Sequence, residues 1–139
     1  HAVAYHIPEM FFMRTVHTNM KKSILVVDDD NMNLARTQII LGKEYDVLTA
    51  ESGMDALMRL KDTKVDMVLL DIDMPEMNGI ETFERMKGFA PEIPVIFLTA
   101  SGLEEDVVSA IKLGAVNYLK KPYRPQELLK RISQEFEKR

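Results

Sequence analysis

From Ser23 onward the chain alternates between short apolar runs and segments whose apolar residues recur at helical spacing. The apolar runs predict five strands, over residues 24–30, 45–50, 65–70, 94–100 and 115–121. The other segments predict five helices, over residues 31–42, 52–61, 79–87, 103–114 and from Pro125 onward. Strands and helices that alternate in this way predict an α/β fold, a doubly wound parallel sheet with helices on both faces.

The third apolar run, in the stretch VDMVLLDIDMPEMNGIE at residues 65–81, ends in a carboxylate. A run this dense is typical of a strand that is buried on both faces in the middle of a parallel sheet. A buried charge is costly, so we expect Asp71 at the carboxyl end of the strand, in the crevice where open α/β sheets bind ligands. A second carboxylate, Asp73, and a turn through Pro75 and Gly79 follow.

Residues suited to capping stand at the expected helix ends. A side-chain oxygen before a helix accepts from its free N–H groups, and a glycine often ends it. The candidates are Asp30 or Asn31, Ser52 with Asp55, Ser101 with Glu104, and the glycines Gly42 and Gly114.

Residues 1–19 differ from the rest of the chain. They are fairly apolar, but Pro8 and charged residues interrupt them, so no clean run is long enough for a membrane anchor, and no basic stretch precedes one as in a signal peptide. The segment MKKSILVV at Met20 resembles a natural start. We therefore interpret residues 1–19 as an upstream extension or an appended segment, with a docking segment as the alternative, and residues 20–139 as one domain.

Composition narrows the chemistry that this domain can carry. The 139 residues are 46% hydrophobic and 29% charged, as in an ordinary globular protein, and a formal charge of −4 argues against a binder of the nucleic-acid backbone. There is no cysteine, which excludes disulfides and thiolate sites, and a reducing cytoplasm is the expected location. The only histidines are His1, His6 and His17, so the domain lacks a serine–histidine couple and a histidine zinc site.

Polar side chains are predicted to gather at one edge of the sheet. The carboxyl ends of parallel strands meet there, which brings together residues 28–30, Asp71, Thr99, Lys120 and Lys121. Carboxylates this close repel one another, and a hard divalent cation holds them ionised. Mg²⁺ suits the site because it takes few carboxylates plus a substrate phosphate, while a lysine and a hydroxyl bind the remaining phosphoryl oxygens. Asp71 is therefore placed to accept a phosphoryl group.

Together these motifs resemble the receiver domain of response regulators. The motifs VVDDD, LLDIDMPEMNG, LTA and KKPY follow one another in the order that this family has, and the resemblance covers residues 23–138. It implies a flavodoxin-like sheet with the strand order 2-1-3-4-5, for which the chemotaxis member of the family is a known example. It also implies a domain that is phosphorylated on an aspartate and then changes the surface that it presents to partners.

The resemblance implies a Mg²⁺ site around the phosphoacceptor. The acidic pair of the family matches Asp28 and Asp29, and its phosphoacceptor matches Asp71. The backbone carbonyl that the family uses as a metal ligand falls on Asp73. The family often has an uncharged residue at that position, so the Asp73 side chain is expected to face solvent.

Three further positions carry the switch that the resemblance implies. The switch hydroxyl of the family matches Thr99 and its aromatic switch position matches Tyr118. Its lysine matches Lys121 and not Lys120, because Lys121 directly precedes Pro122, whose peptide bond in this family is typically cis. The alternatives are that Thr99 is an ordinary strand residue and Tyr118 an ordinary half-buried aromatic.

Two other classes of protein share part of this pattern. Asp71-Ile72-Asp73 has the spacing of the haloacid-dehalogenase-type phosphatases, but their motif normally ends the first strand and they usually need a cap domain. A flavodoxin-like FMN binder needs serine, threonine and glycine amides after the first strand, where this chain is acidic. A colourless protein that hydrolyses no phosphomonoester would set both aside.

The resemblance implies a signalling switch and not an enzyme with a diffusible substrate. Residues 18–139 contain no histidine, so the phosphoryl donor is expected on a separate histidine kinase or histidine phosphotransfer protein. A homodimer formed on phosphorylation is a further expectation, weakened because GAVNYLKKPY lacks the acidic pair that many DNA-binding relatives carry before the switch aromatic. No direct binding of nucleic acid or membrane by this domain is expected.

Overall fold

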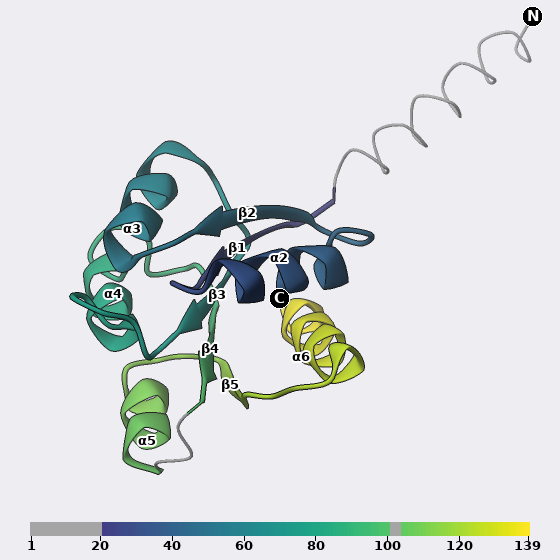
Figure 1. Ribbon diagram of the computed structural model, residues 1–139. Coiled ribbons are helices and arrows are strands. Elements are labelled where there is room, and N and C mark those ends of the chain that lie inside the picture. The colour runs from purple at the N-terminus through teal and green to yellow at the C-terminus, as the bar shows by residue number, and fades with distance from the viewer. Residues whose placement is uncertain (1–20, 101–103) are drawn as a thin grey trace, which may run out of the picture.

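Five parallel strands form the centre of the molecule (Figure 1), and the computed structural model describes residues 21–100 and 104–139. The strands are β1 (Ser23–Val27), β2 (Asp46–Ala50), β3 (Met67–Asp71), β4 (Val95–Thr99) and β5 (Asn117–Lys120). Their order in the sheet is β2-β1-β3-β4-β5, and every neighbouring pair is parallel. The fold class and the strand order are confirmed.

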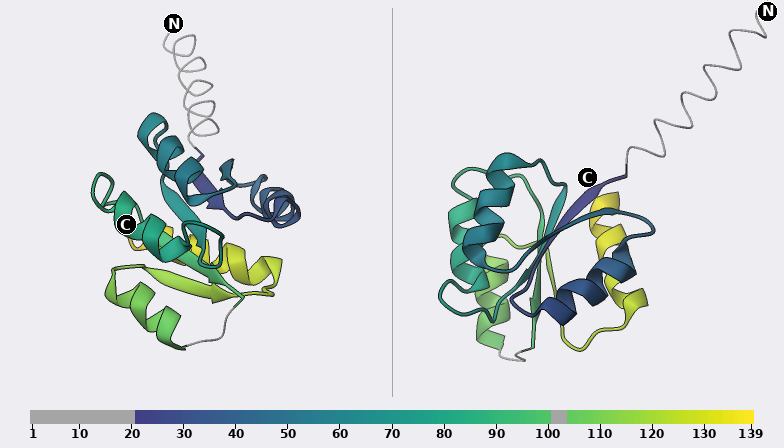
Figure 2. Two further views of the ribbon diagram at one scale, coloured as in Figure 1. Left: turned by 60° about the vertical axis from the view of Figure 1, so that its left-hand side comes forward. Right: turned by 45° about the horizontal axis from the view of Figure 1, so that its top comes forward.

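Helices cover both faces of this sheet (Figure 2). They are α2 (Asn31–Leu41), α3 (Gly53–Asp62), α4 (Gly79–Met86), α5 (Glu104–Lys112) and α6 (Pro125–Glu137). In the right-hand view of Figure 2, α2 and α6 lie on one side of the strands, and α3, α4 and α5 lie on the other. None of the helices in the described part of the chain is long and apolar enough to cross a membrane.

Two apolar layers, one on each face of the sheet, explain why the central strands read as continuous apolar runs. Alternate residues of a strand point to opposite faces, and here both faces are covered. Leu25, Val68 and Phe97 belong to the layer under α3, α4 and α5, whereas Ile24 and Leu69 belong to the layer under α2 and α6. Each such side chain, at most 1% exposed, stabilises the fold by roughly 1.5–3 kcal/mol.

Asp66, the one acid in the third apolar run, lies just before β3 and not inside it. Its Oδ2 accepts hydrogen bonds from the backbone N–H of Ser23 at 2.8 Å and from the Ser23 hydroxyl at 3.3 Å. The strand therefore begins at Met67, two residues later than predicted, and ends at Asp71 itself. Asp66 is a link between neighbouring strand starts, which is why an acid is tolerated there.

Side chains cap the helices at the predicted places. Asp30, and not Asn31, caps α2, because its Oδ1 accepts from the backbone N–H of Met32 at 2.9 Å. Ser52 caps α3 by accepting from the N–H of Asp55 at 3.0 Å. The predicted segment at residues 1–19 and the predicted cap Ser101 lie outside the described residues, as does the predicted helix start at residue 103.

Candidate functional site

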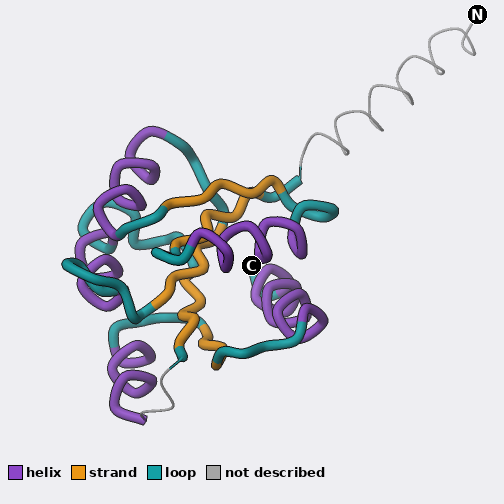
Figure 3. The backbone as a smooth tube through the Cα atoms, viewed as in Figure 1, coloured by secondary structure: helices purple, strands orange, loops and turns teal. Residues whose placement is uncertain are grey.

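The carboxyl ends of four strands bring the predicted site residues to one edge of the sheet. Figure 3 shows the strands running through the middle of the molecule and the loops that leave their ends. Asp28 directly follows β1, Asp71 is the last residue of β3, Thr99 is the last residue of β4, and Lys121 directly follows β5. Sequence positions up to 93 residues apart thus meet in space, as the parallel topology predicted.

Three carboxylates form a tight cluster at this edge. One oxygen from each of Asp28, Asp29 and Asp71 lies within 4.8 Å of the other two. Asp28 and Asp71 are 3% and 4% exposed, whereas Asp29 is exposed to solvent. Backbone N–H groups orient the two buried carboxylates, from Asp30 to Asp28 Oδ1 at 2.9 Å and from Asp73 to Asp71 Oδ1 at 3.2 Å.

Lys121 places one positive charge against this cluster. Its Nζ lies 2.9 Å from Asp28 Oδ2 and 3.4 Å from Asp71 Oδ2. Burial alone would lower the pKa of this ammonium, but the hydrogen bond to Asp28 and the charges of Asp71 and Asp28 outweigh burial and raise it. Three ionised carboxylates and one ammonium leave two negative charges, which is the charge that a divalent cation balances.

The pKa of Asp71 is raised from 3.8 to about 6. Burial is the main cause, and the charge of Asp28 adds to it. The Lys121 charge and the hydrogen bonds from Asp73 and Lys121 act in the opposite direction without cancelling the effect of burial. Asp71 is therefore mostly ionised at neutral pH but is held in a costly, poorly solvated state.

The remaining predicted positions differ in exposure. Thr99 is 1% exposed at the end of β4, and its carbonyl accepts from the backbone N–H of Lys121 at 2.7 Å. Tyr118 is 38% exposed on β5. The side chains of Asp73 and Lys120 are exposed, as expected from the sequence. The Lys121–Pro122 peptide bond is cis, which confirms that expectation.

Gly79 is a site residue that the sequence showed only as part of a turn. A Cβ at this position would collide with the carbonyl oxygen of Asp71 and lie 2.8 Å from the Cα of Ile72. The Gly79 N–H donates to the carbonyl of Ile72 at 2.9 Å, which closes the loop after β3. The first turn of α4 thus packs directly on the backbone of Asp71, and only glycine leaves room for it.

The sequence as a whole matches a known family. Residues 24–133 match the response regulator receiver domain. The chain belongs to this family. The receiver fold accounts for the motif order, and neither the phosphatase nor the FMN-binding alternative is supported.

Relatives of this receiver domain include regulators of transcription. The chain is 37% identical to the alkaline phosphatase synthesis transcriptional regulatory protein PhoP of Bacillus subtilis, over 81% of this chain and 48% of PhoP. It is 45% identical to the transcriptional regulatory protein ZraR of Klebsiella oxytoca, over 71% of this chain and 23% of ZraR. The chain therefore spans about half, or less, of the length of these curated relatives.

Solved receiver domains have the same fold. A CheY-like receiver domain protein from Methanospirillum hungatei superposes with a TM-score of 0.81 at 31% identity, covering 84% of this chain and 94% of the other. The beryllofluoride-activated DrrB receiver domain superposes with a TM-score of 0.78 at 33% identity, covering 85% and 99%. The likeness extends over nearly the whole of both solved domains.

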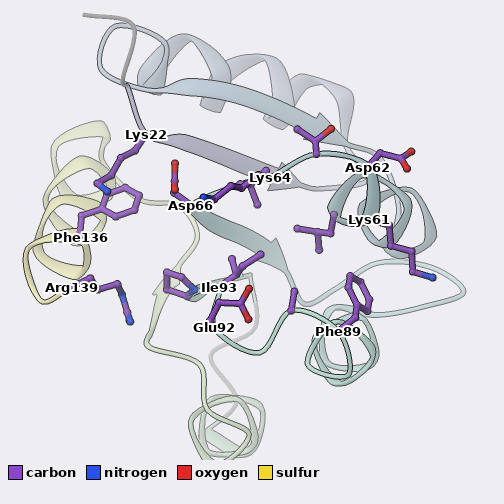
Figure 4. A pocket seen from close by; sticks show the side chains of 15 residues that line it. Lys22, Lys61, Asp62, Lys64, Asp66, Phe89, Glu92, Ile93, Phe136 and Arg139 are labelled. Carbon is purple, nitrogen blue, oxygen red and sulfur yellow. The ribbon is translucent and has the colours of Figure 1, made fainter. Parts of the chain in front are cut away.

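A second hollow in this receiver domain lies away from the carboxylates. A cavity of about 530 Å³ opens at the opposite end of the strands, beside Asp66 and Ile93, where β3 and β4 begin (Figure 4). Lys22 lies 5.1 Å from the centre of the Phe136 ring, and other lysines line the rim. Because this edge carries the amino ends of the strands, the cavity is no part of the carboxylate site.

Proposed function

We propose that Asp71 accepts a phosphoryl group from a histidine kinase or histidine phosphotransfer protein, with Mg²⁺ beside it. The domain is then a switch and not an enzyme that turns over a diffusible substrate. The observation that carries this proposal is the meeting of Asp28, Asp29, Asp71 and Lys121 at one edge of the sheet. Family membership supports the same chemistry.

The carboxylates fit the preferences of Mg²⁺. It is a hard cation that binds one or two carboxylates together with waters and phosphate oxygens, and one oxygen from each of Asp28, Asp29 and Asp71 lies within 4.8 Å of the other two. The backbone carbonyl of Asp73 is the further ligand that we expect. When bound, Mg²⁺ supplies positive charge that reduces repulsion between Asp71 and an incoming phosphoryl group.

Asp71 is the nucleophile in this mechanism. A carboxylate oxygen of Asp71 forms a bond to phosphorus while the phosphorus–nitrogen bond of the donor's phosphohistidine breaks, and the electron pair returns to the imidazole. Lys121, already 3.4 Å from Asp71, is positioned to pair with a phosphoryl oxygen. Hydrolysis resets the switch, since attack of water on phosphorus breaks the bond to Asp71 and releases phosphate.

The donor protein has a surface to cover next to Lys121. A cavity of about 310 Å³ lies between α2 and the loop after β5, and Arg36, Lys121 and Tyr123 are among its lining residues. On the same helix, in its first turn, Met32 is 81% exposed. An exposed apolar side chain on a helix that lines this cavity is suited to a partner that docks there and brings its phosphohistidine to Asp71.

The signal is carried onward by Thr99 and Tyr118. A phosphoryl group on Asp71 adds acceptor oxygens at the edge where Thr99 ends β4, and its hydroxyl donates to one of them. Movement of Thr99 leaves space beside β5 into which the half-exposed Tyr118 ring turns. The partner-binding surface changes because the phosphorylated state favours one of two arrangements.

Phosphorylation by a small donor tests the proposal. Acetyl phosphate is expected to add one phosphoryl group with Mg²⁺ and none with EDTA, as read by intact mass and peptide mapping. Asp71→Asn should abolish the modification, whereas Asp73→Asn should keep it. Lys121→Ala should slow signalling far more than Lys120→Ala, which alters only an exposed side chain. A stable, base-labile phosphate on Asp71→Asn would sink the assignment.

A further inference from the structure

A third buried carboxylate, Glu135, lies on α6, outside the carboxylate cluster. Glu135 is 2% exposed and lies on the same face of the helix as Leu128 and Ile132, seven and three residues earlier. Its Oε2 accepts from Asn117 Nδ2 at 3.0 Å and from Lys138 Nζ at 3.3 Å. A buried charge needs such partners, so Glu135 fixes the side chain of Asn117 on the neighbouring strand.

Asn117 passes this constraint to the switch position. Its Oδ1 accepts from Arg131 Nη1 at 2.8 Å and from the backbone N–H of Tyr118 at 2.8 Å. The same Arg131 nitrogen donates to the carbonyl of Tyr118 at 2.9 Å. The amide orientation is dictated by chemistry, because the Glu135 carboxylate can only accept and the Arg131 guanidinium can only donate.

These hydrogen bonds satisfy backbone groups on the outer side of β5, the outermost strand of the sheet. β5 is an edge strand with β4 as its partner, and consecutive residues of a parallel strand direct their backbone groups to opposite sides. The N–H and C=O of Tyr118 are taken by Asn117 and Arg131, which are side chains and not a neighbouring strand. An edge that is capped in this way holds its position and resists pairing with another chain.

We propose that Glu135, Asn117 and Arg131 are positioning residues that hold the β5 backbone, so that phosphorylation of Asp71 moves the Tyr118 ring and not the strand. The inference rests on the proposed function for its link to phosphorylation. It also accounts for the amide side chain at residue 117. The amide donates to the buried Glu135 carboxylate through Nδ2 and accepts from Arg131 through Oδ1 at the same time, whereas a carboxylate at this position could only accept.

Exchanging the hydrogen-bond donor and acceptor between residues 117 and 135 tests the network. Asn117→Asp sets a carboxylate against Glu135 and should destabilise the fold and loosen β5. Adding Glu135→Gln restores a donor opposite the new carboxylate, which still accepts from Arg131, so the double variant should recover most of the loss. The matched control is Glu127→Gln, which removes only an exposed partner of Arg131 at 3.8 Å. Urea unfolding of the wild type, Asn117→Asp, Glu135→Gln and the double variant gives the double-mutant cycle.

The response to beryllofluoride with Mg²⁺ separates positioning from simple stabilisation. In the wild type, NMR should show a large shift of the Tyr118 ring and small shifts of the β5 amides. In Asn117→Asp the ring shift should fall at least twofold and the β5 amides should broaden, while fluorine NMR still shows bound beryllofluoride. The double variant and Glu127→Gln should respond as the wild type does.

The outcomes separate the two proposals. A wild-type ring response in Asn117→Asp, or a double variant that fails to recover it, would overturn the positioning role. If Asn117→Asp does not fold, the double variant still decides, because it must fold and respond if the donor–acceptor network is what matters. If the wild type binds no beryllofluoride, the proposed function fails. The double-mutant cycle in urea still measures whether Asn117 and Glu135 interact, independently of that result.

Discussion

At the scale of single residues, Asp71 combines reactivity with a cost to the fold. Its carboxylate is 4% exposed and its pKa is raised to about 6, mainly by burial. Between about pH 4 and pH 6 the folded protein therefore binds a proton that the unfolded chain has released, so the free energy of unfolding falls as pH rises through this window. The site is less stable at neutral pH than its packing alone would make it.

Asp71→Asn should therefore stabilise the protein at neutral pH in EDTA. The full pKa shift corresponds to about 3 kcal/mol, and because the charges of Asp28 and Lys121 both act on Asp71 we expect ~1–2 kcal/mol. The gain should shrink as pH falls toward 4, where the wild-type carboxyl is protonated in the folded protein and about half protonated in the unfolded chain. Urea unfolding between pH 4 and 7.5 measures it, with the exposed Asp73→Asn as control. A gain that does not change with pH would contradict this reading of Asp71.

At the scale of elements, the loop from β3 to α4 sets the position of Asp71, the proposed phosphoacceptor. Asn78 caps α4 by accepting from the N–H of Glu81 at 2.9 Å, and Gly79 then packs on the carbonyl of Asp71. Glu76 in this loop has a left-handed backbone with φ of 66°, a conformation that costs a non-glycine residue energy. The loop is tightly constrained on the side that faces Asp71.

Gly79→Ala should push α4 and the end of β3 apart. The new Cβ meets backbone atoms that cannot rotate away, so we expect a loss of about 2–3 kcal/mol in the free energy of unfolding and slower phosphorylation of Asp71. Gly88→Ala is the control, because its Cβ would come no closer than 3.2 Å to the carbonyl oxygen of Arg85. Equal losses of unfolding free energy in the two variants would show that close packing at Gly79 is not required.

Elements and strand ends could be predicted from the sequence because their causes are local. Dense apolar runs marked the strands, and the parallel topology then placed Asp28, Asp71 and Lys121 together. Close contacts between segments that are distant in the sequence are harder to predict from the residue pattern. Gly79 reads as an ordinary turn, and Glu135 reads as one of the polar residues of α6 until its spacing from Leu128 is compared with the buried face.

At the scale of the whole molecule, the fold concentrates negative charge at the carboxyl edge of the sheet. Mg²⁺ should bind there and stabilise the folded state in proportion to its occupancy, by about 2.7 kcal/mol at 100 times its dissociation constant. Asp28→Asn should blunt this effect, whereas Asp46→Asn, at the amino end of β2, should not. Thermal unfolding across a Mg²⁺ series measures it. An unchanged Tm and unchanged amide spectra of the wild type would exclude the metal site.

At the same scale, a change at Asp71 is expected to reach Tyr118 across the sheet. Asp71 ends β3, Thr99 ends β4, and Tyr118 lies on β5, so the three residues stand on successive strands of the sheet. In the proposed switch, a phosphoryl group on Asp71 attracts the Thr99 hydroxyl, and the arrangement with Tyr118 turned inward gains population only by that differential interaction. Beryllofluoride with Mg²⁺ should therefore perturb amide resonances of α5 and β5 well beyond direct contact.

Thr99→Ala removes the hydroxyl and little else from this path. We expect Asp71 still to be phosphorylated, more slowly, while the shifts on α5 and at Tyr118 fall to less than half of the wild-type values. Thr82→Ala, at an equally buried threonine on α4, is the matched control for loss of a buried hydroxyl. The substitution is expected to change the population of the two arrangements and not the structure of either one. The residual chemical shifts should therefore lie on the line that joins the free and phosphorylated wild-type positions. Full distal shifts in phosphorylated Thr99→Ala would mean that Thr99 is not the relay.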